Sequence, residues 1–243
     1  MQRHFDHCDV AASPAGLAAR VADWLLEFAG KSTGPFTIAL AGGDTPKALY
    51  ALLAAPAYRE RFPWQRTHWF WGDERCVPHY DPASNYKMVC EAMLSVVPVS
   101  ASNIHAVPTH LLPQAAAAAY ERNLKTYYGA DNFDPSRPLF DVMLLGLGAD
   151  GHTASLFPRT DALDERSHWV AVGAGPNAQP RITLTYPALE STRAAAFLVA
   201  GASKQAMLQR LMAGDTELPA ARLRPTGQLY LFADQAALGR ATS

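Results

Sequence analysis

An aspartate and a histidine stand two residues apart in a glycine-rich segment near the middle of the chain. This segment, residues 146–158, reads GLGADGHTASLFP and follows an apolar run, residues 140–145, that is typical of a buried strand. Ligands of open α/β sheets bind where strands end. An imidazole titrates near neutral pH, and a neighbouring carboxylate orients it. We therefore expect Asp150 and His152 to serve hydrolysis, with His152 activating water.

A second glycine-rich segment, AGGDTP, lies between an apolar strand and a helix. Backbone N–H groups at the start of a helix bind phosphate, and glycines allow the anion to approach closely. Gly42, Gly43 and Thr45 are therefore candidate phosphate-binding residues. Thr45 is also expected to cap the helix, with Pro46 in its first position. A tight turn without a ligand is the alternative, and the Walker spacing GxxxxGK[ST] is absent.

Three basic residues are candidates for binding an anionic substrate. Arg75 ends the run GDER at the end of a strand, where it is expected to face an anionic or carbonyl oxygen. Arg181 opens a strand, and Lys204 lies at the start of a helix. The helix dipole disfavours a cation there, so a bound anion would offset the cost. A solvated surface position is the alternative for Arg75 and Lys204.

The segments around these residues alternate between helix and strand patterns. The pattern predicts an α/β fold with a doubly wound, mostly parallel sheet and helices on both faces. Expected helices cover residues 15–28, 46–53, 85–94, 114–128 and 203–212. Expected strands cover residues 36–41, 67–71, 140–145, 169–172, 182–185, 196–200 and 228–232. No repeat or linker interrupts the pattern, so we expect a single domain over residues 1–243.

Composition excludes several classes of partner. The 243 residues are 49% hydrophobic and 18% charged, which is typical of a globular protein, and a net charge of −1 favours neither nucleic acid nor an anionic membrane. No apolar run approaches the ~20 residues that span a bilayer. Three cysteines without CxxC spacing, and no signal-peptide pattern in residues 1–10, predict a cytoplasmic protein.

Other chemistries have weaker support. Gly146, Gly148 and Gly151 match GxGxxG, but Pro158 interrupts the helix that a dinucleotide site requires there. No HExxH motif is present, so a metal site is not expected. The GxSxG motif of serine hydrolases is also absent. Direct attack by an activated water is therefore favoured over covalent catalysis.

Taken in chain order, six segments resemble the 6-phosphogluconolactonases of the glucosamine-6-phosphate isomerase superfamily: residues 41–46, 71–78, 84–86, 146–158, 181–185 and 201–204. The resemblance implies hydrolysis of 6-phospho-D-glucono-1,5-lactone to 6-phosphogluconate in the oxidative pentose phosphate pathway. It also implies a doubly wound α/β fold with no metal or organic cofactor. The implied partner is a small sugar-phosphate lactone.

The resemblance also implies roles for particular residues. The phosphate would be bound by the glycine loop, here Gly43 and Thr45, together with Arg181 and Lys204. His152 would deprotonate water and Asp150 would support it, while Arg75 would face the substrate end of the cleft. One position departs from the family: its loop commonly reads SGGSTP, and here Asp44 precedes Thr45. A carboxylate pointing into a phosphate site would be repulsive, so Asp44 is expected either to turn outward or to offer only its backbone.

Two alternatives belong to other classes of function. Glucosamine-6-phosphate deaminases resemble this chain in the glycine loop and in the DGH run, but they carry a glutamate five residues after the histidine. Phe157 stands there in this chain and cannot supply the additional acid or base that ring opening needs. A non-catalytic phosphosugar-binding regulator would keep Arg181 and Lys204 but would not need His152.

Overall fold

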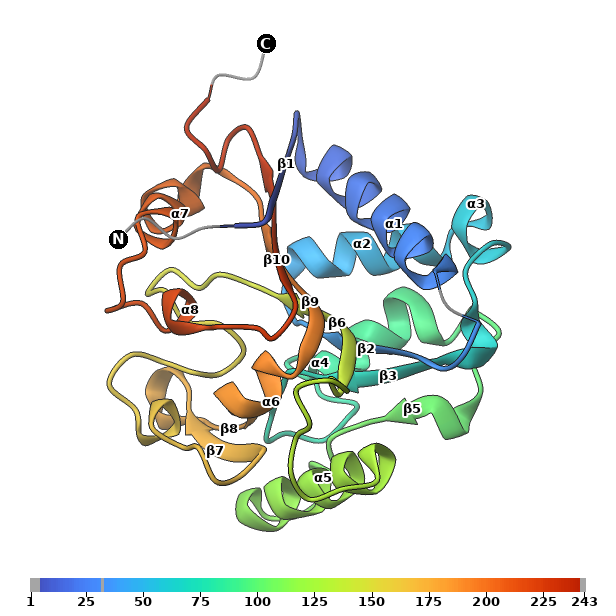
Figure 1. The fold of residues 1–243 in the computed structure, drawn as a ribbon, viewed down its shortest axis with the longest axis vertical. Helices are drawn as coiled ribbons and strands as arrows, with labels where there is room; N and C mark the ends of the chain where they lie inside the picture. Colours follow the sequence, from blue (N-terminus) through green and yellow to red (C-terminus); the bar gives the residue numbers. More distant parts are fainter. Residues whose placement is uncertain (1–4, 32, 241–243) are drawn as a thin grey trace.

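The computed structural model describes residues 5–31 and 33–240. Its strands are β1 (His7–Ala11), β2 (Phe36–Leu40), β3 (Thr67–Trp71), β4 (Asp73–Arg75), β5 (Ile104–His105), β6 (Phe140–Leu145), β7 (Val170–Ala174), β8 (Pro180–Leu184), β9 (Thr192–Val199) and β10 (Gln228–Asp234). Within the described residues, a seven-stranded parallel sheet has the order β1-β10-β9-β6-β2-β3-β5. A three-stranded antiparallel sheet has the order β4-β8-β7 (Figure 1).

Helices cover both faces of the parallel sheet. They are α1 (Pro14–Gly30), α2 (Asp44–Ala54), α3 (Pro56–Arg59), α4 (Asn85–Val89), α5 (Pro113–Tyr128), α6 (Tyr186–Glu190), α7 (Gln205–Met212) and α8 (Pro219–Arg222). Figure 1 shows α1 and α2 on one face, with α5, α6 and the small sheet on the other. This arrangement confirms the predicted α/β class with a parallel sheet between helical layers.

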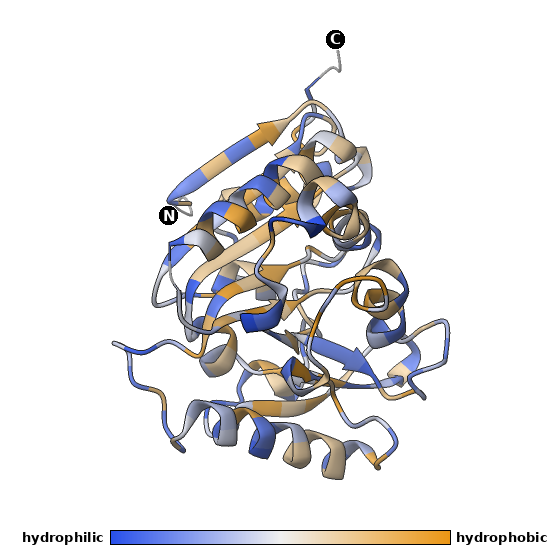
Figure 2. Ribbon diagram, turned by 90° about the vertical axis from the view of Figure 1, so that its right-hand side faces the viewer, coloured by the Kyte–Doolittle hydropathy of each residue, from blue (hydrophilic) through white to orange (hydrophobic). Residues whose placement is uncertain are grey.

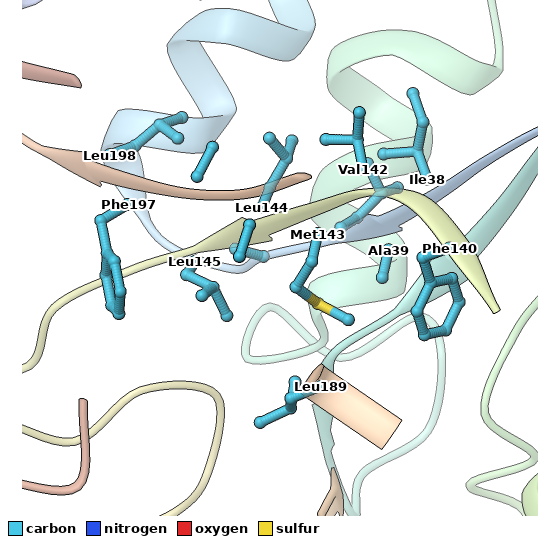
Figure 3. Close-up of a cluster of buried hydrophobic side chains, with 14 of the residues drawn as sticks. Ile38, Ala39, Phe140, Val142, Met143, Leu144, Leu145, Leu189, Phe197 and Leu198 are labelled. Atoms are coloured by element: carbon cyan, nitrogen blue, oxygen red, sulfur yellow. The ribbon is translucent and has the colours of Figure 1, made fainter. Parts of the chain in front are cut away.

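The last four residues of the central strand β6 are all apolar because both of its faces are buried. Val142 and Leu144 point toward the α2 side, whereas Met143 and Leu145 point toward the opposite side (Figure 3). These four side chains are at most 1% exposed. Successive side chains of a strand face opposite sides, so a strand covered on both faces favours consecutive apolar residues.

The predicted helices are present, with small changes at their ends. Ser13 caps α1 through its hydroxyl, which accepts a hydrogen bond from Gly16 N at 3.2 Å. The expected helix at residues 85–94 consists of α4 followed by a π-helical turn, Cys90–Leu94. The expected helix at residues 203–212 begins as a 3₁₀ turn, Ala202–Lys204, and continues as α7.

Two predicted strands do not join the parallel sheet. Residues 169–172 and 182–185 fall in β7 and β8, which pair antiparallel with each other, and β8 pairs with β4. Their connection spans only residues 175–179, and parallel pairing needs a crossover of about a dozen residues or more. A short connection therefore forces the hairpin, a detail that the prediction of a mostly parallel sheet did not specify.

The start of α2 also differs from the prediction that Thr45 caps it. Gly43 is the N-cap, at a φ of 102°, and its carbonyl accepts a hydrogen bond from Lys47 N at 3.1 Å. The helix therefore begins at Asp44, with Thr45 and Pro46 inside its first turn. Glycine adopts a positive φ at no steric cost, which lets the chain turn before the threonine.

The strands β1, β4 and β5 were not predicted. β1 alternates between hydrophilic and hydrophobic residues (Figure 2) and lies at one edge of the parallel sheet. β5 has only two residues and lies at the other edge. Short or half-exposed edge strands lack the apolar run that marks a central strand. Among the helices of the described chain, none has the length and apolar character needed to cross a bilayer.

Candidate active site

A cavity of about 280 Å³ opens at the carboxyl ends of β2, β3 and β6. From β2 the chain moves outward through β3 and β5 on one side, and from β6 through β9 and β10 on the other. The cavity therefore lies where the strand order reverses, which is where open α/β sheets bind ligands. Among the predicted site residues, the cavity is lined by Gly42, Gly43, Arg75, His152, Arg181 and Lys204.

Asp150 and His152 form a close pair at this cavity. His152 Nδ1 lies 2.5 Å from Asp150 Oδ1, and the same oxygen accepts a hydrogen bond from His152 N at 3.1 Å. Partial burial raises the pKa of the Asp150 carboxyl, but the hydrogen bonds and charge of His152 outweigh it, so the pKa lies below its ordinary value. The carboxylate therefore favours a proton on Nδ1 and leaves Nε2 as the proton acceptor.

The loop that carries this pair depends on two glycines. Gly148 N donates to His152 O at 2.9 Å, which closes the loop. A Cβ at Gly148 would lie 2.0 Å from His152 Nδ1, so no larger residue fits beside the imidazole. Gly151 has a φ of 83°, in the left-handed region that favours glycine.

Arg181 reaches the cavity from β8. Its Nη1 lies 3.9 Å from Asp73 Oδ2, and its guanidinium carbon lies 5.8 Å from the centre of the Phe157 ring. The side chain is only 14% exposed. Burial, followed by the nearby charge of Arg75, lowers the pKa of Arg181. A half-buried cation beside an open cavity is suited to binding an anion.

Lys204 and Arg75 approach the cavity from other elements. Lys204 precedes α7, and its Nζ donates to the carbonyl of Leu147 at 2.8 Å. Arg75 lies on β4 and donates from Nη1 to the carbonyl of Ala83. Together with Arg181, these residues give the cavity a cationic wall.

The glycine loop meets the cavity through its two glycines. Gly42 and Gly43 line the cavity, whereas Asp44 and Thr45 are not among its lining residues. Asp44 is exposed and lines a neighbouring cavity with Lys47. Within the described residues, no cluster of histidine, cysteine, aspartate and glutamate has the arrangement of a metal site.

Comparison with known proteins agrees with this geometry. Residues 12–231 match the family described as glucosamine-6-phosphate isomerases/6-phosphogluconolactonase. The chain belongs to this family. It is 43% identical over 237 residues to the 6-phosphogluconolactonase of Nostoc sp., covering 94% of this chain and 95% of the relative. It is 33% identical to the 6-phosphogluconolactonase of Haemophilus influenzae, covering 84% and 87%.

Solved structures of the family have the same fold. The 6-phosphogluconolactonase from Trypanosoma brucei superposes with a TM-score of 0.85 at 30% identity, covering 97% of this chain and 99% of the other. That from Trypanosoma cruzi gives 0.86 at 28% identity, covering 100% and 99%. A monomeric glucosamine-6-phosphate deaminase gives 0.80 at 18% identity, covering 96% and 99%, and this likeness shows the fold alone.

Phe157 lies five residues after His152, where a glucosamine-6-phosphate deaminase is expected to carry a glutamate. Its ring centre lies 4.3 Å from that of His152, and Arg181 lies on the same ring. The side chain is 7% exposed. An apolar ring thus lies close to both the imidazole and the guanidinium, at a position that itself supplies no acid or base.

Three polar residues of the family motifs were not assigned a role from sequence. Asp73 and Asn85 line the cavity, and Ser155 Oγ donates to Asp73 Oδ2 at 2.5 Å. Asn85 Nδ2 donates to the main-chain carbonyl of Asp73 at 2.9 Å. All three lie in segments that carried the family resemblance, so a signal was present. Which of them faced the cavity depended on the pairing of β4 with β8 and on the start of α4.

Proposed function

We propose that this protein hydrolyses 6-phospho-D-glucono-1,5-lactone to 6-phospho-D-gluconate, a step of the oxidative pentose phosphate pathway. The observation that carries the proposal is the Asp150–His152 pair at a cavity with a cationic wall. The relatives named 6-phosphogluconolactonase support it. The free thiols of Cys8, Cys76 and Cys90 suit a reducing compartment, so we place the reaction in the cytoplasm.

The phosphate group anchors the substrate in the cavity. Backbone N–H groups of Gly42 and Gly43, with the side chains of Arg181 and Lys204, hold it at one end of the cavity. Thr45 is left out because it does not line the cavity. Binding the remote phosphate orients the lactone carbonyl toward the catalytic base.

Hydrolysis then proceeds by general-base catalysis. His152 Nε2 takes a proton from water while the water oxygen bonds to the lactone carbonyl carbon. Asp150 holds the imidazole and stabilises the imidazolium that forms. Arg75 stabilises the negative charge that develops on the carbonyl oxygen. When the bond between the carbonyl carbon and the ring oxygen breaks, the imidazolium returns its proton to the ring oxygen, and the carboxylic acid product ionises. No metal or cofactor enters these steps.

The test is to form the lactone in situ with glucose-6-phosphate dehydrogenase and to follow its disappearance. A blank without this protein is essential because the lactone opens spontaneously. Acceleration over the blank is the expected result. No acceleration, together with ammonia release from glucosamine 6-phosphate, would replace the proposal with a deaminase. Binding of 6-phosphogluconate without either activity would replace it with a phosphosugar-binding protein.

A further inference from the structure

Glu74 is a carboxylate enclosed directly behind the cavity wall. It is 1% exposed and receives hydrogen bonds from four donors. Oε1 accepts from Arg75 N at 2.7 Å and from Asn85 N at 2.8 Å. Oε2 accepts from Tyr86 N at 2.7 Å and from Ser84 Oγ at 3.0 Å. One buried side chain therefore joins β4 to the beginning of α4.

This carboxylate bears a large desolvation cost that its donors offset only in part. Burial raises the pKa of Glu74 above its ordinary value, although the backbone N–H groups of Tyr86, Asn85 and Arg75 act in the opposite direction. Hydrogen bonds from backbone N–H groups to an ionised oxygen are among the stronger ones in proteins. A negative charge at the N-terminus of the helix at residues 85–94 is also favoured by the helix dipole. Backbone N–H groups of β4 and α4 thus donate hydrogen bonds to the carboxylate oxygens of Glu74.

The helix end fixed by Glu74 carries a side chain of the cavity wall. Asn85 Nδ2 donates to Asp73 O at 2.9 Å and approaches Asp73 Oδ1 at 3.4 Å. On its other side, Asn85 lies against the glycine loop, where a Cβ on Gly42 would come within 2.2 Å of Asn85 Oδ1. The Asn85 amide is therefore wedged between the phosphate-binding loop and β4. Any shift at the beginning of α4 moves the wall of the cavity.

We propose that Glu74 is a positioning residue for this site. It holds the Asn85 amide against Gly42 and fixes the backbone of Arg75, so that both ends of the cavity keep their spacing. Glu74 itself does not line the cavity and touches no reacting atom. The inference rests on the proposed function, because its effect is expressed in the turnover of the lactone.

The first test replaces Glu74 with glutamine, which has the same shape but must turn an N–H toward donors that need an acceptor. Glu74→Gln should lower kcat/KM by up to about 10²-fold, the cost of displacing groups that orient a substrate. The loss should appear mainly in KM, because Asn85 faces the glycine loop. Ser84→Ala, which removes one of four donors, should have a smaller effect in the same direction and serves if Glu74→Gln fails to fold.

Glu121 provides the matched control. It is also a buried carboxylate, 8% exposed, and accepts from Trp169 N at 3.2 Å and Val170 N at 3.4 Å, away from the cavity. Glu121→Gln should lower the melting temperature and leave kcat/KM near the wild-type value. If Glu74→Gln behaved in the same way, losing stability and no activity, the proposal would be overturned.

A double-mutant cycle separates positioning from general destabilisation. If Glu74 acts through Asn85, the double variant Glu74→Gln/Asn85→Ala should lose less activity than the product of the two single losses. Fully multiplicative losses would contradict the proposal. The same cycle is measured with the dissociation constant of 6-phosphogluconate by calorimetry. Wild-type protein that binds the ligand without accelerating hydrolysis would refute the proposed function, and the binding cycle would still decide the role of Glu74.

Discussion

Arg75 and Arg181 stand directly opposite each other in the antiparallel pair of β4 and β8. Both line the same cavity, and within the described structure the Nε of each is buried without a hydrogen-bond partner. Like charges opposite one another weaken a sheet. The arrangement is therefore expected to be more stable when an anion is bound beside the two guanidinium groups.

Binding of 6-phosphogluconate should raise the melting temperature, because a ligand at 100 times its Kd stabilises a protein by about 2.7 kcal/mol. Arg181→Gln should remove most of that shift at the same ligand concentration. Arg166→Gln is the control, since Arg166 lies over the Tyr186 ring at 4.9 Å, outside the cavity. Differential scanning fluorimetry measures both. Equal shifts in the two variants would argue against an anion site at Arg181.

His152→Ala should lower kcat by about 10²- to 10⁴-fold, the usual contribution of a general base. Asp150→Asn should lower kcat in the same direction, because it removes the charge that supports the imidazolium. A second histidine–carboxylate pair gives the control: His168 Nδ1 lies 3.2 Å from Glu165 Oε2, away from the cavity. His168→Ala should leave kcat unchanged in the coupled lactone assay. Full activity in His152→Ala would require another base.

Lys204→Met should raise KM with a smaller effect on kcat, because it removes a cation from the proposed phosphate end while keeping most of the side-chain volume. The loss also deprives the Leu147 carbonyl of its donor at 2.8 Å. Lys31→Met removes an exposed lysine that pairs with Glu27 at 3.1 Å and is the control. Steady-state kinetics over a range of lactone concentrations distinguishes the two. An unchanged KM in Lys204→Met would place the phosphate elsewhere.

Gly148→Ala should reduce kcat while the protein still folds, because the new Cβ would lie 2.0 Å from His152 Nδ1 and displace the imidazole. Gly146→Ala, two residues earlier, meets no heavy atom within 4 Å and should cost much less. Circular dichroism checks folding and the lactone assay checks turnover. Similar losses of kcat in both variants would assign the effect to the conformation of the loop rather than to the position of the imidazole.

Stability should fall in mildly acidic solution because of a histidine pair on β3 and β5. His68 Nδ1 lies 3.1 Å from His105 Nε2, and burial lowers the pKa of both imidazoles. The unfolded chain then binds protons at a higher pH than the folded one. The stabilisation is therefore complete above about pH 6.5, the ordinary histidine value, and is lost as the pH falls through the lowered folded values.

Urea unfolding across this range measures the effect. The free energy of unfolding of the double variant His68→Gln/His105→Gln should depend less steeply on pH than that of the wild type. His110→Gln changes an exposed histidine and should keep the wild-type slope. An unchanged slope in the double variant would assign the acid sensitivity to other groups.

Sequence patterns alone predict the five inner strands of the parallel sheet and the close approach of one pair of polar residues. Apolar runs such as residues 140–145 are dictated by burial on both faces of a sheet, so they are legible without knowing any partner strand. Local turn chemistry marked where those strands end, and Asp150 and His152 are neighbours because only Gly151 lies between them. Their contact needed no information beyond the loop.

Distant residues share the cavity because of long-range strand pairing and helix docking. Arg75 and Arg181 meet because β4 and β8 pair in a second sheet, and strand pairing is a long-range choice that local apolar patterns do not encode. The predicted cap at Thr45 was wrong for a local reason: a positive φ at Gly43 makes this glycine the N-cap and starts α2 at Asp44. Glu74 was assigned no role from sequence, because three of its four donors reach it only when the beginning of α4 docks on β4.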